Sequence, residues 1–497
     1  MIWALVVACA VVVVPSALRW LRVAQREHYL PGSVSRFAVR WWSAGPMNLA
    51  LLAISVAGVI GSIWLAPLGF LVPLAQIGPV GLTVRGRTSP LAWTDRLRRL
   101  AALTGVLALG FFVIGGVLGR AFIVALGLFL IPALVDLGLA LLAPIERRMG
   151  IRWVDQASAR LRSSGARVVA ITGSYGKTTT KRYVAHLISG SYRTVASPAS
   201  FNNRMGLARA VNENLIPGTE VFVAEMGTYG PGEIADLCSW MQPEVSALVS
   251  IGPVHLERFG TEERIVTAKA EILDSARVGV IAVDHPLLAN LAEDRAGSMD
   301  IITVSGEGAD ASVTVAGGIL MVRGERVAEV PSDVFAVNLA VAFGVALALG
   351  LEAGDLANRI GDLPRTEHRQ TVSESERGFS IIDDTFNSNP AGARSALRRL
   401  GGLGGAGRKV VVTPGMIELG PVQFDSNREF ASEAAGVADD LVVVGVTNRR
   451  ALLEGSANGP ASVTVVASRA EAVNWVRATL GPGDAVLYEN DLPDHYP

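Results

Sequence analysis

The sequence predicts an α/β protein that is joined to a bundle of apolar helices at its N-terminus. Long apolar runs are confined to the first third of the 497 residues, whereas short β-branched runs alternate with helical patterns from residue 168 onward. A glycine-rich turn joins the first of these β-branched runs to a helix. Half of the residues are hydrophobic, 18% are charged and the mean hydropathy is +0.39, so a disordered chain is excluded and a purely soluble one is disfavoured.

The charge balance and the cysteine count exclude further classes. The net charge is −1 and the pI is about 6.6, so no overall basic charge indicates a nucleic-acid partner. The two cysteines, Cys9 and Cys238, are too few for a disulfide framework or a zinc ribbon. The 44 basic residues include only four lysines, and we expect a lysine to persist where arginine cannot replace it. These lysines are Lys177, Lys181, Lys269 and Lys409.

Residues 1–150 are predicted to form a transmembrane domain of about five helices. Apolar runs cover residues 2–18, 47–83, 100–119 and 121–143. The second run is about twice the length that one membrane helix needs, so it fits two spans that turn at Pro67. A single long span or a re-entrant pair is the alternative for this run.

Arginine-rich loops predict the orientation of these helices. Residues 19–46 and 84–99 each carry five arginines against one acidic residue, so both loops are expected in the cytoplasm with the N-terminus outside. The protein is therefore expected in the cell membrane as a multi-pass protein with cytoplasmic catalytic domains. The first run lacks the basic flank of a signal peptide. Asp136, inside the last run, is either a functional intramembrane carboxylate or a packed residue near the interface.

Two α/β units are predicted after the apolar helices. The first has strands at 168–172, 221–225, 245–250 and 278–283, an antiparallel meander at 312–330 and a helix at 335–349. The second has strands at 380–384, 409–413, 441–445, 463–466 and 484–488. The predicted domains are therefore residues 1–150, 151–363 and 364–497.

A phosphate-binding loop follows the first predicted strand. Its glycines allow backbone N–H groups to converge on phosphate oxygens, Lys177 can neutralise these oxygens, and Thr178 can offer a hydroxyl to Mg²⁺. The common form of this loop has a glycine five residues before Gly176, where this chain has Ile171, so the loop is shortened. The predicted nucleotide contacts in it are Gly173, Ser174, Tyr175, Gly176, Lys177, Thr178 and Thr179.

The shortened loop and its threonine run resemble those of the Mur ligases, the ATP-dependent amide-forming enzymes of cell-wall precursor synthesis. Further segments similar to the family's motifs follow in its order, at residues 200–206, 224–234, 254–260, 267–272, 383–390 and 414–420. The segments at 224–234 and 383–390 are most similar to the branch that adds D-alanyl-D-alanine. The resemblance is strong over 165–420 and looser beyond. It implies a central P-loop ATPase domain and a C-terminal Rossmann-like domain.

The resemblance also implies the chemistry. ATP would activate a carboxylate as an acyl phosphate, which an amine would then attack. The implied catalytic residues are Lys177, His255, Lys269 and Arg369. Two Mg²⁺ ions are implied, the first held by Thr178 and Glu225 and the second by His255. Lys269 would be carbamylated and would thereby supply an anionic oxygen ligand, an adduct that arginine does not readily form.

The remaining implied contacts come from both α/β units. Asn338 would contact adenine and Arg369 the γ-phosphate, while Asp384 and Asn387 would complete the nucleotide site. The implied substrate contacts are Asn202, Asn203 and Asn389. Because these groups lie on two domains, we expect domain closure to gate the activity.

Three departures from the family's pattern are visible. The apolar helices replace the N-terminal domain that binds a uridine-nucleotide sugar. Val334 and Phe335 stand where the family has His-Asn. Glu489, Asn490 and Asp491 stand where the D-alanyl-D-alanine branch has Lys-Gly-Ser, so that dipeptide specificity is not carried over. This acidic end either favours an amine-bearing acceptor or is solvent-exposed.

The sequence therefore favours a membrane-anchored ligase that forms an amide bond on a lipid-linked or other cell-envelope precursor. A polymer-forming relative of the polyglutamate synthetases is a close variant of this hypothesis. An ATP-dependent membrane scaffold or transport protein is an alternative from another class, motivated by the apolar runs and Asp136. A soluble-precursor dipeptide-adding enzyme that is merely tethered is the third hypothesis.

Overall fold

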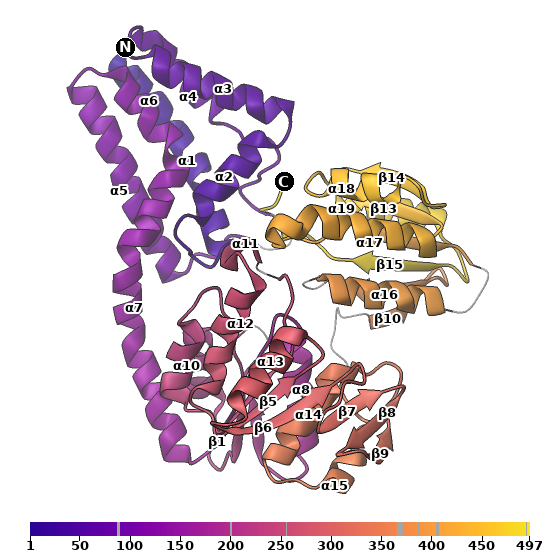
Figure 1. Ribbon diagram of the computed structural model, residues 1–497. Helices are drawn as coiled ribbons and strands as arrows, with labels where there is room; N and C mark the ends of the chain where they lie inside the picture. The colour runs from indigo at the N-terminus through magenta and orange to yellow at the C-terminus, as the bar shows by residue number, and fades with distance from the viewer. Residues whose placement is uncertain are drawn as a thin grey trace.

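The computed structural model describes residues 1–86, 90–198, 201–254, 256–364, 371–385, 388–403, 407–493 and 495–497. A helical N-terminal region lies beside two sheet-containing units, and its N-terminus is at the end farthest from both (Figure 1). Three residues implied by the family resemblance, His255, Arg369 and Asn387, lie outside the described residues.

The N-terminal region consists of helices that pack around buried aromatic and aliphatic side chains, including Trp20 and Phe37. The longest helix, α7, leaves this region and extends along the central unit (Figure 1). The helices are α1 (Ile2–Arg26), α2 (Ser33–Ser43), α3 (Pro46–Gly61), η1 (Ala66–Phe70), α4 (Leu71–Ala75), α5 (Asp95–Val117), α6 (Ala121–Phe129) and α7 (Ile131–Ser164).

The number of membrane spans, expected from the sequence to be about five, stays a prediction, and the described helices can be compared with it by length and composition. In the described part of the chain, only α1 and α5 are long and apolar enough to cross a membrane, and at most four spans result if each bent helix pair counts as one. The predicted hairpin at 47–83 is divided into α3, which at 1.5 Å per residue is only about 24 Å long, and the shorter η1–α4. The run at 121–143 is bent by 68° between α6 and α7.

The two long helices have much uncovered apolar surface. Only 17% of the most apolar window of α1 and 33% of that of α5 is buried. By contrast, the apolar helix α14 (Ala336–Ala348) of the central unit has most of its residues buried. An exposed apolar surface of this kind is typical of a region that faces lipid or another protein.

Asp136 has a structural role in this region. Its carboxylate accepts hydrogen bonds from the backbone N–H groups of Gly32 (2.9 Å), Val34 (3.2 Å) and Ser35 (2.7 Å). These N–H groups belong to the N-cap residue and the first turn of α2, and they have no partner inside the helix. Asp136 therefore caps α2 and joins it to α7, which agrees with the packed alternative for this residue.

The central unit contains a sheet in which the described residues form nine strands in the order β2-β3-β1-β4-β5-β6-β7-β8-β9. Neighbouring strands are parallel as far as β7, and β7, β8 and β9 form the expected antiparallel meander. The strands are β1 (Arg167–Thr172), β2 (Thr194–Ala196), β3 (Val221–Glu225), β4 (Val245–Leu248), β5 (Val278–Ala282), β6 (Asp300–Ser305), β7 (Val313–Ala316), β8 (Ile319–Val322) and β9 (Glu325–Glu329).

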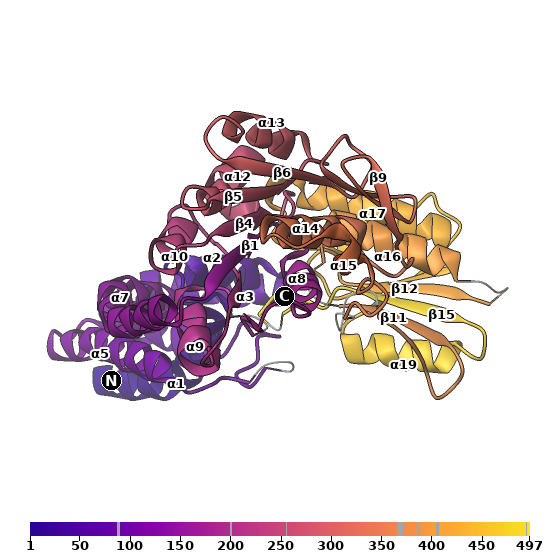
Figure 2. The same cartoon turned by 90° about the horizontal axis from the view of Figure 1, so that it is seen from below.

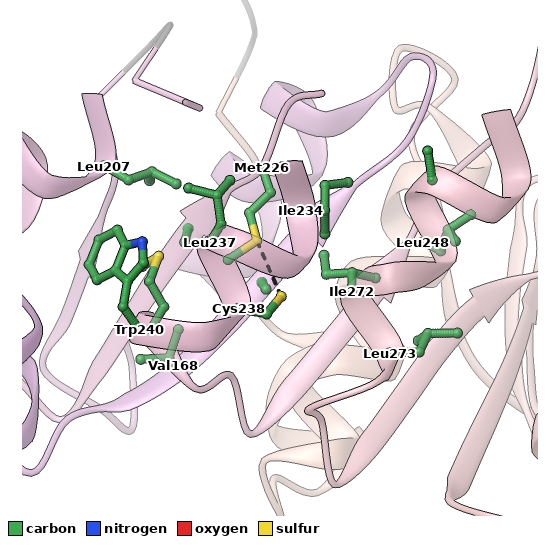
Figure 3. Packing of buried hydrophobic residues seen from close by; sticks show 14 of the residues in the cluster. Val168, Leu207, Met226, Ile234, Leu237, Cys238, Trp240, Leu248, Ile272 and Leu273 are labelled. Carbon is green, nitrogen blue, oxygen red and sulfur yellow. Dashed lines mark hydrogen bonds between the residues drawn. The ribbon is translucent and has the colours of Figure 1, made fainter. Parts of the chain in front are cut away.

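Helices cover both faces of the central sheet. One face packs against α9 and α10 through side chains such as Leu207, Ile234 and Trp240, and there the Cys238 thiol lies 3.9 Å from the sulfur of Met226 (Figure 3). The other face packs against α8 and α14. The helices are α8 (Lys177–Ile188), α9 (Arg204–Asn214), α10 (Glu233–Met241), α11 (Leu256–Phe259), α12 (Glu262–Ala270), η2 (Glu271–Leu273), α13 (Pro286–Arg295) and α15 (Ala353–Ala357).

The C-terminal unit has a second sheet, in which six described strands lie in the order β10-β11-β15-β12-β13-β14, parallel except for β10. Figure 2 shows α16 and α17 on one face of this sheet and α19 on the other. The strands are β10 (Thr371–Glu374), β11 (Ser380–Asp384), β12 (Lys409–Thr413), β13 (Asp440–Val444), β14 (Ser462–Val466) and β15 (Ala485–Glu489). The helices are α16 (Pro390–Gly402), η3 (Gly420–Val422), α17 (Gln423–Val437), α18 (Arg449–Ser456) and α19 (Arg469–Thr479).

Candidate active site

The phosphate loop connects the carboxyl end of β1 to the first turn of α8. Gly176 has a φ of +81°, and a Cβ there would lie 2.5 Å from the Asn338 side chain, so glycine is required by conformation and by space. The neighbouring loop after β4 supports this turn, because Ser250 accepts a hydrogen bond from the backbone N–H of Ser174 (2.9 Å) and its hydroxyl accepts another from that of Tyr175 (3.0 Å). The phosphate loop is therefore held in place by the loop that follows β4.

Two of the four lysines meet at one carbonyl oxygen of this loop. Lys177 Nζ donates to Gly173 O at 2.6 Å, and Lys269 Nζ donates to the same oxygen at 3.0 Å, although the two lysines are 92 positions apart. Burial lowers the pKa of Lys269 well below the usual lysine value, and the nearby charge of Lys177 lowers it further. Lys269 therefore has access to the neutral amine form at pH values where an exposed lysine is charged.

Glu225, at the end of β3, lies beside the first turn of α8. Its Oε2 atom accepts hydrogen bonds from Thr178 Oγ1 (2.9 Å) and Lys181 Nζ (3.0 Å). Burial alone would raise the pKa of Glu225, but the charges of Lys181 and Lys177 and the two hydrogen bonds outweigh it and lower the pKa below the usual value. Glu225 is therefore an ionised carboxylate next to a threonine hydroxyl.

Lys181 is a further residue of this site, which no motif in the sequence identified as such. Its side chain is buried and forms an ion pair with Glu225 in which both side chains are only 4% exposed. The scarcity of lysine was the signal that could have identified it, since Lys181 is one of four and three of the four lie in or beside this site.

A cavity of about 360 Å³ lies between the central and C-terminal units. Tyr175, Gly176 and Asn338 line it from one side, and Asp384 and Ser388 line it from the other. The Asn338 carboxamide is held by Gly176 O (2.8 Å) and Thr180 Oγ1 (2.9 Å). The structure thus brings the predicted adenine residue, the phosphate loop and the predicted residue Asp384 to one cavity.

Two of the predicted substrate residues are helix caps. Asn203 Oδ1 accepts from Gly206 N and caps α9, and Asn389 Oδ1 accepts from Gly392 N and caps α16. Asn202 lies closer to the site, because its amide donates weakly to Glu225 Oε1 at 3.4 Å. A substrate contact for these three asparagines stays a prediction.

The described residues include no cluster of three or more His, Cys, Asp or Glu side chains that could hold a metal ion. The donors for the first implied Mg²⁺ are nevertheless together, since Thr178 and Glu225 are 2.9 Å apart and hydroxyl and carboxylate oxygens suit this ion. His255, the residue implied for the second ion, lies outside the described residues.

The acidic end of β15 is not solvent-exposed as a whole. Glu489 is completely buried and accepts hydrogen bonds from Thr413 (2.6 Å) and from Ser388, a residue of the nucleotide cavity. Burial raises its pKa above the usual value, against the effect of these two bonds. Asp491 pairs with Arg469. The exposed alternative is therefore wrong for Glu489.

All three parts of the molecule meet at α11. Arg258 of this helix pairs with Glu27 after α1 (3.2 Å) and with Glu418 of the C-terminal unit (3.3 Å). Glu27 also pairs with the His495 ring at 2.8 Å, and both of these side chains are buried. We call Glu27, Arg258, Glu418 and His495 the junction cluster.

The C-terminal tail packs on α2 beside the junction cluster. Trp41 Nε1 donates to His495 O at 2.8 Å, and the Phe37 ring contacts those of His495 and Tyr496 with centroids 4.8 and 4.9 Å away. Figure 1 shows the C-terminus next to α2, far from the N-terminus of the chain. The sequence contained no signal for this contact between segments more than 450 residues apart.

The sequence of this chain matches two domains of one family. Residues 171–342 match the Mur ligase middle domain, and residues 368–488 match the glutamate ligase domain of the Mur ligases. Together these matches cover more than half of the chain and confirm the resemblance seen in the sequence.

Individual relatives give the same result. The UDP-N-acetylmuramoyl-tripeptide–D-alanyl-D-alanine ligase of Bacillus subtilis is 30% identical over 55% of this chain and 61% of its own length. The enzyme of that name from Mycobacterium leprae is 29% identical over 66% of this chain and 72% of its own length. This chain therefore spans about two thirds of these relatives.

Solved structures share the fold. MurF from Acinetobacter baumannii is 25% identical with a TM-score of 0.60 and covers 69% of this chain and 77% of its own. MurF from Thermotoga maritima, solved in complex with ADP, is 24% identical with a TM-score of 0.58 over 69% and 80% of the two chains. The apolar helices of residues 1–150 precede the family domains.

Proposed function

Since this chain belongs to the Mur ligase family, we propose that it is a membrane-anchored, ATP-dependent ligase that joins a carboxylate to an amine on a lipid-linked or other cell-envelope precursor. The observation that carries the proposal is the convergence of Lys177 and Lys269 on Gly173 O, beside the pair of Thr178 and Glu225. This arrangement places cationic, hydroxyl and carboxylate groups around one phosphate loop.

The residues of the loop would position ATP for attack by a carboxylate. Backbone N–H groups of the turn and the Lys177 ammonium would bind the phosphates and stabilise the charge that develops on them during transfer. Thr178 and Glu225 would hold a Mg²⁺ ion, which supplies charge neutralisation when bound. The carboxylate would displace ADP to give an acyl phosphate, and the amine would then displace phosphate to give the amide.

Lys269 is proposed to act as a carbamate. Its buried, depressed-pKa amine can attack CO₂ as the neutral form, which gives an N-carboxylate and releases one proton. The product would replace a cation by an anionic oxygen ligand for a second metal ion. Burial supports this proposal, because a charged ammonium at this position is disfavoured.

Membrane anchoring is supported by the exposed apolar surface of α1 and α5 and by the arginine-rich segments 19–46 and 84–99 that adjoin their apolar parts. The side chains of α1 and α5 that face outward include Val7, Val11, Val106, Leu109 and Val117. Such a region would hold the catalytic units at the cytoplasmic face, where lipid-linked precursors are accessible.

A polyglutamate-type polymer synthetase would use the same site and would differ in the length of its product. A transport function is supported less, because Asp136 is engaged in capping α2. The length distribution of the product distinguishes a ligase that forms a single amide bond from a polymer synthetase.

The test uses the full chain in detergent with ATP, Mg²⁺ and membrane extract, and measures phosphate release coupled to a new amide. We expect Lys269→Arg to reduce this activity at least about 100-fold while ATP binding is retained, and we expect short carboxylic acids to restore part of it. Lys409→Arg is the matched control, because Lys409 is a half-buried residue of β12 whose amine donates to Gly401 O in an exposed hydrogen bond away from this site. Full activity of Lys269→Arg would contradict the proposed carbamate at Lys269. Phosphate release that does not depend on any carboxylate and amine would contradict the proposed ligase activity.

A further inference from the structure

One side of α7 is uncovered where this helix leaves the helical region. The exposed side chains there recur at a spacing of i, i+3, i+4 and i+7, which places them on one face of a helix, whereas Gly150 and Val154 of the opposite side are buried. Figure 1 shows α7 at the outer edge of the molecule. We call this surface the α7 face, and it consists of Ile145, Arg148, Met149, Arg152 and the adjacent Trp153.

The exposed side chains of α7 change in character along the helix axis. From Leu137 to Ile145 they are all apolar, and from there to Trp153 they include arginines and an aromatic ring. The step from Ile145 to Trp153 is eight residues, or about 12 Å. Apolar side chains followed by basic and aromatic ones are typical of a helix that passes from the hydrocarbon core of a membrane into the headgroup layer. A surface for a soluble protein partner is not expected to follow this order.

The large apolar side chains of the α7 face are half in solvent. Ile145 and Met149 are 50% exposed, and Trp153 is 55% exposed. Such side chains, interleaved with arginines, match the interface of a membrane, where apolar groups enter the acyl layer and charged groups reach the headgroups.

The arginines of the α7 face are available to an external group. Arg148 and Arg152 are exposed and form no side-chain hydrogen bond or ion pair in the part of the chain that the structure describes. The neighbouring carboxylate of Glu146 is already engaged, because its two oxygens accept from Arg99 at 2.7 and 3.0 Å. Each guanidinium of the α7 face therefore keeps its five N–H donors for a partner outside the chain, and two unpaired cations favour an anion.

Several arginines of the two arginine-rich loops are engaged within the protein instead. Arg22 is buried, Arg40 pairs with Glu257 at 2.5 Å, and the Arg96 guanidinium lies 4.3 Å from the centroid of the Tyr29 ring. These side chains hold the helical region together and join it to the central unit. The positive charge of a loop in the sequence therefore does not by itself identify the groups that contact lipid headgroups.

We propose that the α7 face binds the headgroups of anionic phospholipids, with Arg148 and Arg152 on the phosphate oxygens and the apolar side chains against the adjoining acyl chains. The planar guanidinium suits phosphate oxygens because it can donate two parallel hydrogen bonds. This inference rests on the membrane anchoring in the proposed function and is independent of the ligase chemistry. Binding of this kind holds α7 at the membrane surface and thereby fixes the position of the catalytic units relative to the membrane.

The test mixes the full chain in detergent with equal amounts of dioleoyl-phosphatidylglycerol and dioleoyl-phosphatidylcholine, and native mass spectrometry counts the bound molecules of each lipid. The unaltered chain should bind the anionic lipid about 25-fold more tightly, since each arginine near an anionic lipid contributes a factor of about five. Arg148→Gln and Arg152→Gln should each lower this preference about fivefold, and the double variant should abolish it. The affinity for an ATP analogue should stay unchanged, which verifies that each variant is folded.

Two control variants separate the charge of the α7 face from other effects. Arg98 of α5 has a side chain that is 65% exposed, but it pairs with Asp95 at 3.4 Å, so Arg98→Gln should change the lipid preference less than about twofold. Met149→Gln keeps both arginines and removes an apolar contact. It should weaken the binding of both lipids and leave the preference for the anionic one.

Three outcomes would overturn the inference. They are equal affinity of the unaltered chain for the two lipids, a loss in Arg98→Gln as large as that in Arg148→Gln, and a dimer in the same spectra that Met149→Gln dissociates. The last outcome would assign the α7 face to a second copy of the chain.

Flotation with phosphatidylcholine vesicles tests the proposed anchoring separately. A chain that inserts into these vesicles without preferring the anionic lipid keeps the anchoring and loses this site. A chain that binds phosphatidylglycerol through Arg148 and does not insert into vesicles keeps the site and contradicts the anchoring.

Discussion

The phosphate loop and the junction cluster are both buried and charged, but they are assembled differently. The loop and its charged partners lie within residues 171–270, on elements of the central unit. The junction cluster joins Glu27 to Arg258 and His495, which are 231 and 468 positions away in the chain. The first is a site built inside one folding unit, and the second exists only when three units have docked.

We therefore expect the phosphate loop to serve catalysis and the junction cluster to hold the three units together. Charges in the phosphate loop surround positions where ATP and metal would bind, so their loss should affect catalysis first. Charges in the junction cluster have one another as partners, so their loss should affect the arrangement of the units and leave ATP binding intact. Of the three variants below, in order of decreasing effect, the first two test this distinction and the third tests a helix cap that belongs to neither group.

The largest effect is expected for Glu225→Gln. It removes a proposed metal ligand and leaves Lys181 buried without its carboxylate, so we expect at least about 100-fold lower activity and about 3–5 kcal/mol lower stability. The double variant Glu225→Gln with Lys181→Met should recover most of the stability and none of the activity. Chemical unfolding and phosphate release measure the two effects.

The pH dependence of this pair has a definite sign. Burial would raise the pKa of Glu225, but Lys181 and Lys177 lower it overall, so the folded state favours the ionised form. The pair therefore stabilises the protein above the ordinary pKa of glutamate, and its contribution is lost as the pH falls through the lowered value. The unaltered chain should therefore have a higher free energy of unfolding than the double variant Glu225→Gln with Lys181→Met, and this difference should decrease as the pH falls. A difference that does not change with pH would contradict the lowered pKa of Glu225.

A smaller effect is expected for Glu27→Gln in the junction cluster. Arg258 and His495 would lose a buried carboxylate, which costs about 2–3 kcal/mol, and the C-terminal tail should become accessible to carboxypeptidase. ATP affinity should not change. Glu146→Gln is the control, because Glu146 pairs with Arg99 within the helical region. Equal exposure of the tail in both variants would show that the junction cluster does not hold it.

The smallest effect is expected for Asp136→Asn. It removes the negative charge at the N-terminus of α2 and part of the hydrogen bonding to three N–H groups, so we expect a loss of about 1–2 kcal/mol in thermal unfolding and unaltered ATP binding. Asp155→Asn, on the exposed side of the same helix α7, should have no effect. Loss of an ATP-driven transport activity at unchanged stability would instead support the transport alternative.

Much of the fold could be predicted from local patterns. The predicted strands of both units begin and end within two residues of the observed ones, because β-branched runs buried on both faces have a distinct composition. Lys177 and Thr178 could be assigned for a similar reason, since a strand, a glycine turn and a helix are contiguous in the chain. Lys269 needed the family resemblance, and its meeting with Lys177 is a tertiary contact.

Features that depend on the packing of distant segments could not be predicted from local sequence patterns. Glu489 is a charged residue in the sequence, but its burial depends on β15 lying between β11 and β12. Asn203 and Asn389 cap helices α9 and α16, a role that the family resemblance did not imply, and their substrate contact stays a prediction. The bends after Ser43 and Phe129 were not accessible either, because hydropathy does not register where an apolar run changes direction.

The sequence by itself determined the order of the units, the phosphate loop and the family, because these depend on periodicity and on contiguous residues. Only the tertiary structure decided that Lys181 neutralises Glu225, that Asp136 caps α2, and that the α7 face is exposed. The physical reason is that the energy of a charged group depends on its neighbours and its exposure to water. Both are fixed when segments far apart in the chain pack together.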